Sequence, residues 1–209
     1  MSTAIVEYGV GNLFSLRSSL AHLGVESVMA SRPEELLGAE RIILPGVGAF
    51  ADAMARLEGS GLVPALREAA SRGTPLLGIC LGMQLLYETS CEYGRHRGLG
   101  LLEGPILSLR EALRERGVGL KTPHMGWNAL RIAEAHPLLD GVNAGDSVYF
   151  VHSFYAAPDG QALASADYGV EVAAVVRSGS VMGTQFHPEK SGGVGLRILR
   201  NFSELRGPR

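Results

Sequence analysis

A cysteine at the joint between a strand-like and a helix-like segment most constrains what this chain can fold into. The stretch LLGICLGMQLL, residues 76–86, places Cys80 between Gly78 and Gly82. The apolar run before Cys80 is typical of a buried strand, and the residues after it favour a helix. One interpretation is a small buried cysteine at a tight turn. The flanking glycines, which permit a tight turn and close backbone approach, favour a nucleophile on a sharp strand-to-helix turn.

The first half of the chain alternates between strand-like and helix-like segments. Alternation of this kind is typical of a parallel sheet that is covered by helices on both faces. We expect strands over residues 3–8, 26–30, 41–44 and 74–79, and helices over 13–23, 62–72 and 81–89.

The second half favours short strands with short connections, of which the last two form a hairpin, followed by a closing helix. The expected strands cover 106–108, 129–132, 147–152, 161–166, 171–177 and 181–186, and the helix covers 195–205. No repeat, low-complexity tract or linker interrupts the chain. The sequence therefore predicts a single α/β domain over residues 1–209, with one mixed, mostly parallel central sheet and helices on both faces.

Composition excludes several classes of function. With 46% hydrophobic residues, 19% charged residues and a formal net charge of −2, the chain is expected to be globular, with no electrostatic case for nucleic acid or a membrane surface. It has no apolar run of about 18 residues and no signal pattern, so we expect a soluble, cytoplasmic protein. Its 6 histidines are scattered, and G-x-G-x-x-G is absent. We therefore expect no metal and no dinucleotide or other cofactor.

A thiol nucleophile needs a base, and the base needs an orienting group. The stretch GTQFHPEKS, residues 183–191, supplies His187 at the end of an apolar run and Glu189 two residues later. In an extended chain these side chains point the same way, so the His187 ring can lie between Glu189 and Cys80. Singly, the histidine reads as a hydrogen-bonded core residue and the glutamate as a solvated turn residue. Together with the cysteine turn, they predict a Cys-His-Glu triad.

Acyl transfer to a thiol also requires hydrogen-bond donors for the oxyanion. One candidate is the backbone N–H of Leu81, directly after the nucleophile. The other is the loop in ILPGVGAF, residues 43–50, where two glycines free the peptide groups at Val47 and Gly48 to turn inward. Taken alone, this loop is also compatible with a plain turn.

These motifs together resemble those of the class I, triad-type glutamine amidotransferases, over essentially the whole chain. The resemblance implies a flavodoxin-like fold and a reaction in which Cys80 attacks the side-chain amide of glutamine. YGVGN at 8–12, LPGVGAF at 44–50, PHMGWNAL at 123–130 and YFVHSF at 149–154 are similar to one group in this family. That group comprises the glutaminase subunits of a histidine-biosynthesis synthase.

The resemblance also implies binding residues and a partner. Residues expected to contact glutamine are Gln84, His152, Ser153 and Phe154. The implied partner is a cyclase subunit with a (β/α)₈ barrel, which forms a heterodimer with the glutaminase and receives its ammonia. Residues expected at that interface are Asn12, Met125, Trp127, Tyr149 and Lys190.

Three alternatives remain open at the level of sequence. The chain could be the amidotransferase subunit of another synthase, such as that for anthranilate or pyridoxal phosphate, although PHMGWN argues against both. It could be a non-catalytic interaction or regulatory subunit on the same fold, or a thiol hydrolase or peptidase that acts alone. Glutaminase assays with and without a cyclase subunit would separate these readings.

Overall fold

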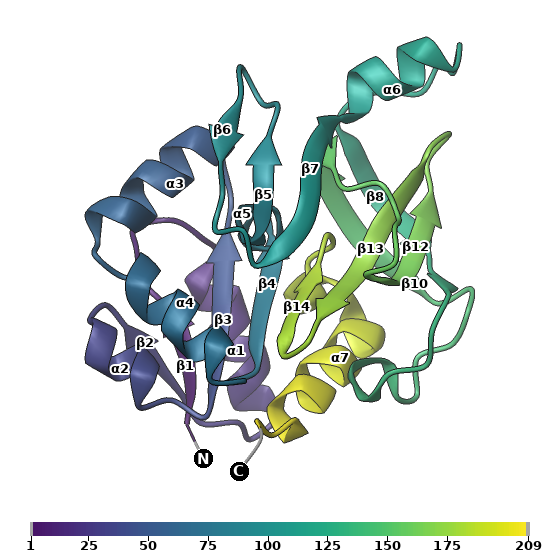
Figure 1. The fold of residues 1–209 in the computed structure, drawn as a ribbon. Helices are drawn as coiled ribbons and strands as arrows, with labels where there is room; N and C mark the ends of the chain where they lie inside the picture. The colour runs from purple at the N-terminus through teal and green to yellow at the C-terminus, as the bar shows by residue number, and fades with distance from the viewer. Residues whose placement is uncertain (1, 208–209) are drawn as a thin grey trace.

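A central sheet of eight strands organises the protein in the computed structural model, which describes residues 2–207 (Figure 1). The strand order is β2-β1-β3-β4-β14-β13-β12-β9. The strands from β2 to β14 pair in parallel, and β13, β12 and β9 add in antiparallel pairing. Their bounds are β1 Thr3–Val6, β2 Ser27–Ala30, β3 Arg41–Gly46, β4 Leu76–Cys80, β9 Arg131–Ile132, β12 Ala162–Asp167, β13 Glu171–Ser178 and β14 Val181–Thr184.

Alternation of side chains along the parallel strands builds two apolar layers. Ile42 and Leu44 belong to one buried cluster, whereas Ile43 between them belongs to the other, as the two-residue period of a strand requires. The first cluster includes buried residues of α2 (Pro33–Leu37), α3 (Phe50–Gly59) and α4 (Val63–Ser71). The second includes those of α1 (Leu13–His22) and α7 (Gly192–Glu204). Helices therefore cover both faces, which confirms the predicted α/β class.

Two smaller sheets accompany the central one, so the prediction of one sheet was wrong in this respect. Strand β8 pairs with β10, and the other sheet has the order β11-β7-β5-β6. The bounds of these strands are β5 Tyr87–Ser90, β6 His96–Arg97, β7 Leu102–Ser108, β8 His124–Ala129, β10 Ser147–His152 and β11 Phe154–Tyr155. The remaining elements are helices α5 (Leu81–Leu86) and α6 (Leu109–Glu115) and the 3-10 turns η1 (Pro137–Leu139) and η2 (Pro188–Lys190).

Two element predictions need correction for identifiable reasons. The helix expected over 81–89 ends at Leu86, because residues from Tyr87 onward pair in parallel with β7. The strand expected over 129–132 is divided between β8 and β9 at the buried Leu130. Strand β8 begins at His124, in a stretch without β-branched residues that reads as turn-rich by propensity. Its pairing with β10 overrides that weak propensity.

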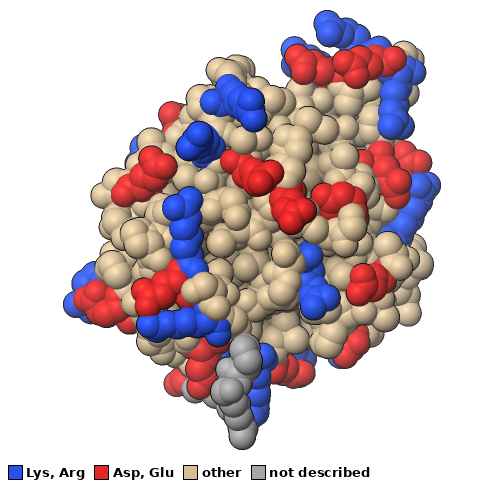
Figure 2. Space-filling view, viewed as in Figure 1, with Lys and Arg blue, Asp and Glu red and all other residues tan. Residues whose placement is uncertain are grey.

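The surface carries no concentrated charge in the view of Figure 2, where acidic and basic side chains are interspersed. Within residues 2–207, no helix is long and apolar enough to cross a membrane.

Candidate active site

Cys80 occupies a strained turn between β4 and α5. Its φ of 53° and ψ of −109° lie in a region that non-glycine residues rarely adopt, and such strain persists where the surrounding structure enforces it. Here the glycines enforce it by close packing. A Cβ at Gly78 would lie 2.6 Å from the Met83 backbone, and a Cβ at Gly82 would overlap the Leu44 carbonyl oxygen. The sequence prediction of a tight turn with glycines on both sides is therefore confirmed.

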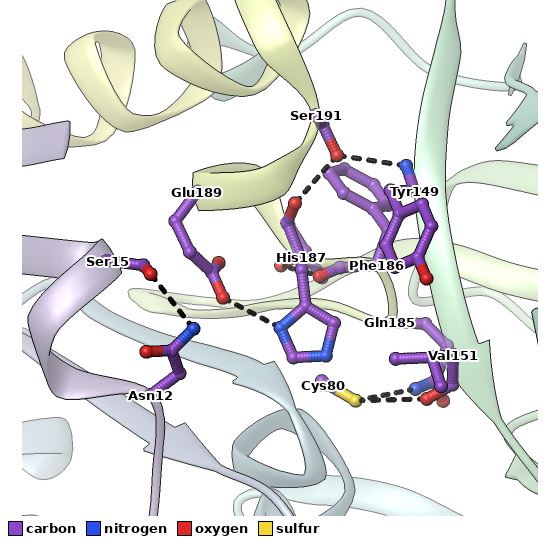
Figure 3. Close-up of polar contacts among 11 residues, drawn as sticks. Asn12, Ser15, Cys80, Tyr149, Val151, Gln185, Phe186, His187, Glu189 and Ser191 are labelled. Carbon is purple, nitrogen blue, oxygen red and sulfur yellow. Dashed lines mark hydrogen bonds and ion pairs between the residues drawn. The ribbon is translucent and has the colours of Figure 1, made fainter. Parts of the chain in front are cut away.

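His187 and Glu189 approach Cys80 from the neighbouring strand. Strand β14 runs parallel to β4, so the residues that follow both strands meet at one edge of the sheet. His187 is buried, its Nδ1 lies 2.8 Å from Glu189 Oε1, and the opposite side of its ring faces the Cys80 sulfur (Figure 3). The side chain of Glu189 is only 4% exposed. The alternative of a solvated turn residue is thus wrong for Glu189.

The local geometry that joins His187 to Glu189 differs from the expectation. The sequence predicts an extended chain, whereas Pro188–Lys190 forms the 3-10 turn η2. His187 itself stays extended because its N–H donates to the Tyr149 carbonyl at 3.0 Å. The Ser191 hydroxyl then donates to the His187 carbonyl at 2.7 Å and accepts from the Tyr149 N–H at 3.0 Å (Figure 3). These bonds fix the histidine between β10 and α7.

The surroundings of His187 favour its charged form. Burial opposes a charge on the ring, but interactions with Cys80 and Glu189 outweigh it and raise the pKa of His187 to about 9. The Cys80 sulfur lies 3.8 Å from both the Val151 carbonyl oxygen and the Gln185 side-chain nitrogen (Figure 3). A histidine held as an imidazolium beside a thiol can donate a proton to a leaving group.

A pocket of about 300 Å³ opens directly over the thiol. It has the size of a small-molecule site. Every residue predicted for the oxyanion or for glutamine lines it, namely Val47, Gly48, Leu81, Gln84, His152, Ser153 and Phe154. The pocket also includes three residues that the sequence did not predict, namely Glu92, Pro123 and Val151.

Gln84 is part of the pocket wall and not a surface residue of its helix. It is 5% exposed, and its side-chain nitrogen donates to the Phe154 carbonyl at 2.9 Å and to Gln185 Oε1 at 3.0 Å. Helix α5 is buried all round, so helical periodicity could not identify the face that lines the pocket.

Glu92 is the functional candidate that sequence reasoning missed. One of its carboxylate oxygens accepts from the Phe50 N–H at 2.6 Å, at the N-terminus of α3. The residue reaches the pocket because the chain leaves α5 at Leu86 and forms β5, whereas a helix to residue 89 was expected. No local motif around Glu92 signals this position.

Three of the residues predicted for a partner interface, Met125, Trp127 and Lys190, are exposed. Met125 and Trp127 on β8 are 61% and 59% exposed, so core packing is excluded for them within this chain. The Trp127 ring meets the Tyr149 ring edge-on at 6.1 Å between centroids, and these residues are register partners in the β8–β10 pair. Lys190 is exposed on η2, and Asn12 is half-buried before α1.

A second, water-sized void of about 10 Å³ lies behind the histidine. Its lining includes Asn12, Val47, His187 and Glu189. Glu189 Oε2 is buried and has no hydrogen-bond partner among the described residues. Figure 3 shows Asn12, whose amide donates to Ser15 Oγ at 3.0 Å, beside the Glu189 carboxylate. Between residues 2 and 207, the structure contains no group of three or more His, Cys, Asp or Glu side chains that could hold a metal ion.

Comparison with known proteins assigns the family. The model of the family "Glutamine amidotransferase class-I" matches residues 4–205. A relative from Geobacillus kaustophilus, "Imidazole glycerol phosphate synthase subunit HisH", is 52% identical over 200 residues, or 95% of this chain and 94% of that protein. The protein of the same name from Geobacter metallireducens is 47% identical and covers 96% of both chains.

Solved structures support the fold. A structure titled "Crystal structure of glutamine amidotransferase" aligns with a TM-score of 0.72 at 22% identity and covers 95% of this chain and 96% of the other. "Structure of PurLQS from Thermotoga maritima" also aligns with a TM-score of 0.72 at 22% identity, with 96% of each chain covered. The chain therefore belongs to the class I glutamine amidotransferases and, within them, to the family of imidazole glycerol phosphate synthase subunit HisH.

Proposed function

We propose that this protein hydrolyses glutamine to glutamate and ammonia, and passes the ammonia to a cyclase subunit that forms imidazole glycerol phosphate and AICAR in histidine biosynthesis. The observation that carries the proposal is the His187–Glu189 pair, which faces Cys80 at the floor of a pocket of about 300 Å³. The names of the relatives support the synthase, and histidine biosynthesis in turn supports a cytoplasmic location.

In the proposed reaction, the Cys80 thiolate attacks the side-chain carbonyl carbon of glutamine. The oxyanion that forms would accept hydrogen bonds from the backbone N–H of Leu81 and from that of Val47 or Gly48, since all three residues line the pocket. His187 donates a proton as the C–N bond breaks and ammonia leaves. It then accepts a proton from water, which attacks the thioester and releases glutamate. Glu189 orients the His187 ring throughout.

The raised pKa of His187 predicts the pH dependence of this step. The departing nitrogen takes its proton from the imidazolium, so kcat/KM should fall above about pH 9, where that proton is lost. Glu189→Gln removes an interaction that raises the pKa of His187, so this descending limb should move to lower pH. A pH profile of glutaminase activity for both proteins measures the shift. A descending limb at the same pH in the parent and in Glu189→Gln would contradict the role of Glu189.

Glu92 is proposed to bind the α-ammonium group of glutamine. A free amino acid carries a positive charge at that end, and Glu92 supplies a carboxylate among the residues that line the pocket. Glu92→Gln keeps an acceptor for the Phe50 N–H but removes the charge, so KM for glutamine should rise about tenfold with a smaller change in kcat. Glu58→Gln, on the exposed side of α3, is the matched control and should leave KM unchanged. Equal KM values for both variants would contradict the assignment.

The void behind His187 supports a route for the ammonia. It is the size of one small polar molecule, and Glu189 Oε2 offers an unpaired acceptor beside it. We propose that ammonia leaves past Glu189 and Asn12 toward the face that carries Trp127 and Lys190. On this proposal the cyclase subunit, a (β/α)₈ barrel, docks there and closes the route from solvent.

Trp127→Ala is expected to weaken cyclase binding by about 2 kcal/mol, because an exposed aromatic side chain is a typical interface anchor. Lys190→Ala should cost a similar amount if it leaves a partner carboxylate unpaired in a desolvated interface. The measurements are the affinity for the cyclase subunit and the ratio of imidazole glycerol phosphate formed to glutamine hydrolysed. Val28→Ala, an exposed apolar residue on edge strand β2, is the control. Unchanged affinity and ratio would remove both residues from the interface.

A further inference from the structure

A line of hydrogen-bonded side chains leads from β8 to the wall of the pocket, and its members Asn128 and His124 have no role in the steps above. Asn128 Nδ2 lies 3.3 Å from His124 Nε2, and His124 Nδ1 lies 2.9 Å from His152 Nε2. His152 Nδ1 in turn lies 2.9 Å from the Phe154 carbonyl oxygen. Both histidines are buried, with 2% and 6% exposure. The line crosses from β8 to the end of β10 and reaches the pocket wall at His152 and Phe154.

The donors and acceptors in this line can be assigned from both ends. The Asn128 amide is fixed because its oxygen accepts from the Ala129 N–H at 2.8 Å and its nitrogen donates to the Asp167 carbonyl at 2.8 Å. Its remaining N–H therefore points to His124 Nε2, which must accept. At the other end, the Phe154 carbonyl can only accept, so His152 carries its proton on Nδ1.

The rings of His124 and His152 are both neutral, which completes the assignment of donors and acceptors. Burial lowers the pKa of His124 to about 4 and, with smaller contributions from His124 and His187, that of His152 to about 3. A neutral His152 that donates from Nδ1 must accept at Nε2, so His124 donates from its own Nδ1. Both rings are thus Nδ1–H tautomers, and all the bonds run in one direction toward Phe154.

Packing holds the first ring of this line in place. The His124 ring stacks on Phe150 with centroids 4.6 Å apart and on Tyr168 with centroids 4.0 Å apart. Its plane therefore has little freedom to turn, which fixes the direction of the Nδ1–H bond.

The line ends at the Phe154 carbonyl oxygen, which also bonds to another residue of the pocket wall. The Phe154 carbonyl accepts from Gln84 Nε2, which donates its second hydrogen to Gln185 Oε1. The Gln185 amide nitrogen lies 3.8 Å from the Cys80 sulfur. A shift of the Phe154 carbonyl would therefore disturb Gln84 and, through Gln185, the groups that contact the Cys80 sulfur.

We propose that His124 is a positioning residue that holds His152 as its Nδ1–H tautomer and thereby fixes the Phe154 carbonyl in the wall of the pocket. The inference rests on the proposed glutaminase function, because it assigns that pocket to glutamine. His124 itself does not line the pocket, so it acts through His152 and Phe154.

Three substitutions separate this role from simple packing. His124→Asn places an amide nitrogen where Nδ1 lies, and so can still donate to His152. His124→Gln carries the same amide one carbon further out, and His124→Phe keeps the aromatic stack but offers no donor. The Gln and Phe variants leave a buried acceptor unpaired, so KM for glutamine should rise about tenfold with a smaller change in kcat. The Asn variant should restore KM to near the parent value.

The assay is glutamate release by the full chain, alone and with the cyclase subunit. If packing alone mattered, the Phe variant would behave like the parent and the Asn variant would be the worst of the three, which would overturn the proposal. Equal KM values for all four proteins would also overturn it. Absence of glutamate release from the parent under both conditions would instead reject the proposed function.

The tautomers provide a test that needs no activity and no variant. Two-bond ¹H–¹⁵N spectra of the ¹⁵N-histidine-labelled protein at neutral pH should show the His124 and His152 rings as neutral Nδ1–H tautomers. A neutral Nε2–H form for either ring would reverse a bond in the line and overturn the proposal, whatever the kinetics show.

Discussion

Cys80→Ala should abolish glutamine-dependent formation of imidazole glycerol phosphate, with a loss of more than about a thousandfold in glutaminase activity. Without the thiol no thioester can form, and the other pocket groups have no nucleophile to assist. Synthesis from added ammonia by the cyclase subunit should survive, because that step requires nothing from this pocket. The measurement is product formation with glutamine or ammonium as the nitrogen source.

Cys91→Ser is the matched control for this experiment. Cys91 is the other cysteine and is exposed, so it should be dispensable in the same assay. Glutaminase activity that persists in Cys80→Ala would show that Cys80 is not the nucleophile. Loss of activity in Cys91→Ser would show that the nucleophile has been assigned to the wrong cysteine.

His187→Asn is expected to be nearly as damaging as the loss of Cys80. In the proposed reaction the imidazole both protonates the leaving ammonia and activates water, so neither half of that reaction should proceed well without it. Glu189→Gln should be less damaging by about two orders of magnitude, because an orienting group contributes less than the group it orients. Steady-state rates of glutamate release measure both effects. Parent-like rates in both variants would exclude the triad.

Local sequence was enough to predict the residues at the ends of adjacent parallel strands. The Gly78–Gly82 turn, the PGVG loop and the HPE motif each follow an apolar strand, and β3, β4 and β14 are neighbours in the sheet. Because the carboxyl ends of such strands meet at one edge, strand order along the sheet brought these motifs together. The central sheet and the helices on both of its faces followed from the same alternation.

The family resemblance placed Gln84 and His152 among the residues expected to contact glutamine, but sequence patterns did not identify their distant hydrogen-bond partners. Gln84 bonds to Gln185, 101 positions away, and His124 bonds to His152, 28 positions away. Neither spacing is a local motif. Glu92 reaches the pocket only because the chain changes from helix to strand after Leu86, where hydrophobic periodicity could not distinguish the two.

Transfer of the glutamine amide nitrogen to product is the direct test of ammonia passage between the two subunits. With the chain and its cyclase subunit together, glutamine labelled with ¹⁵N at the side-chain amide would be supplied in the presence of unlabelled ammonium. We expect labelled imidazole glycerol phosphate and about one glutamate released for each labelled product, because on this proposal the ammonia passes to the partner without mixing with solvent. Glutamate release accompanied only by unlabelled product would contradict it.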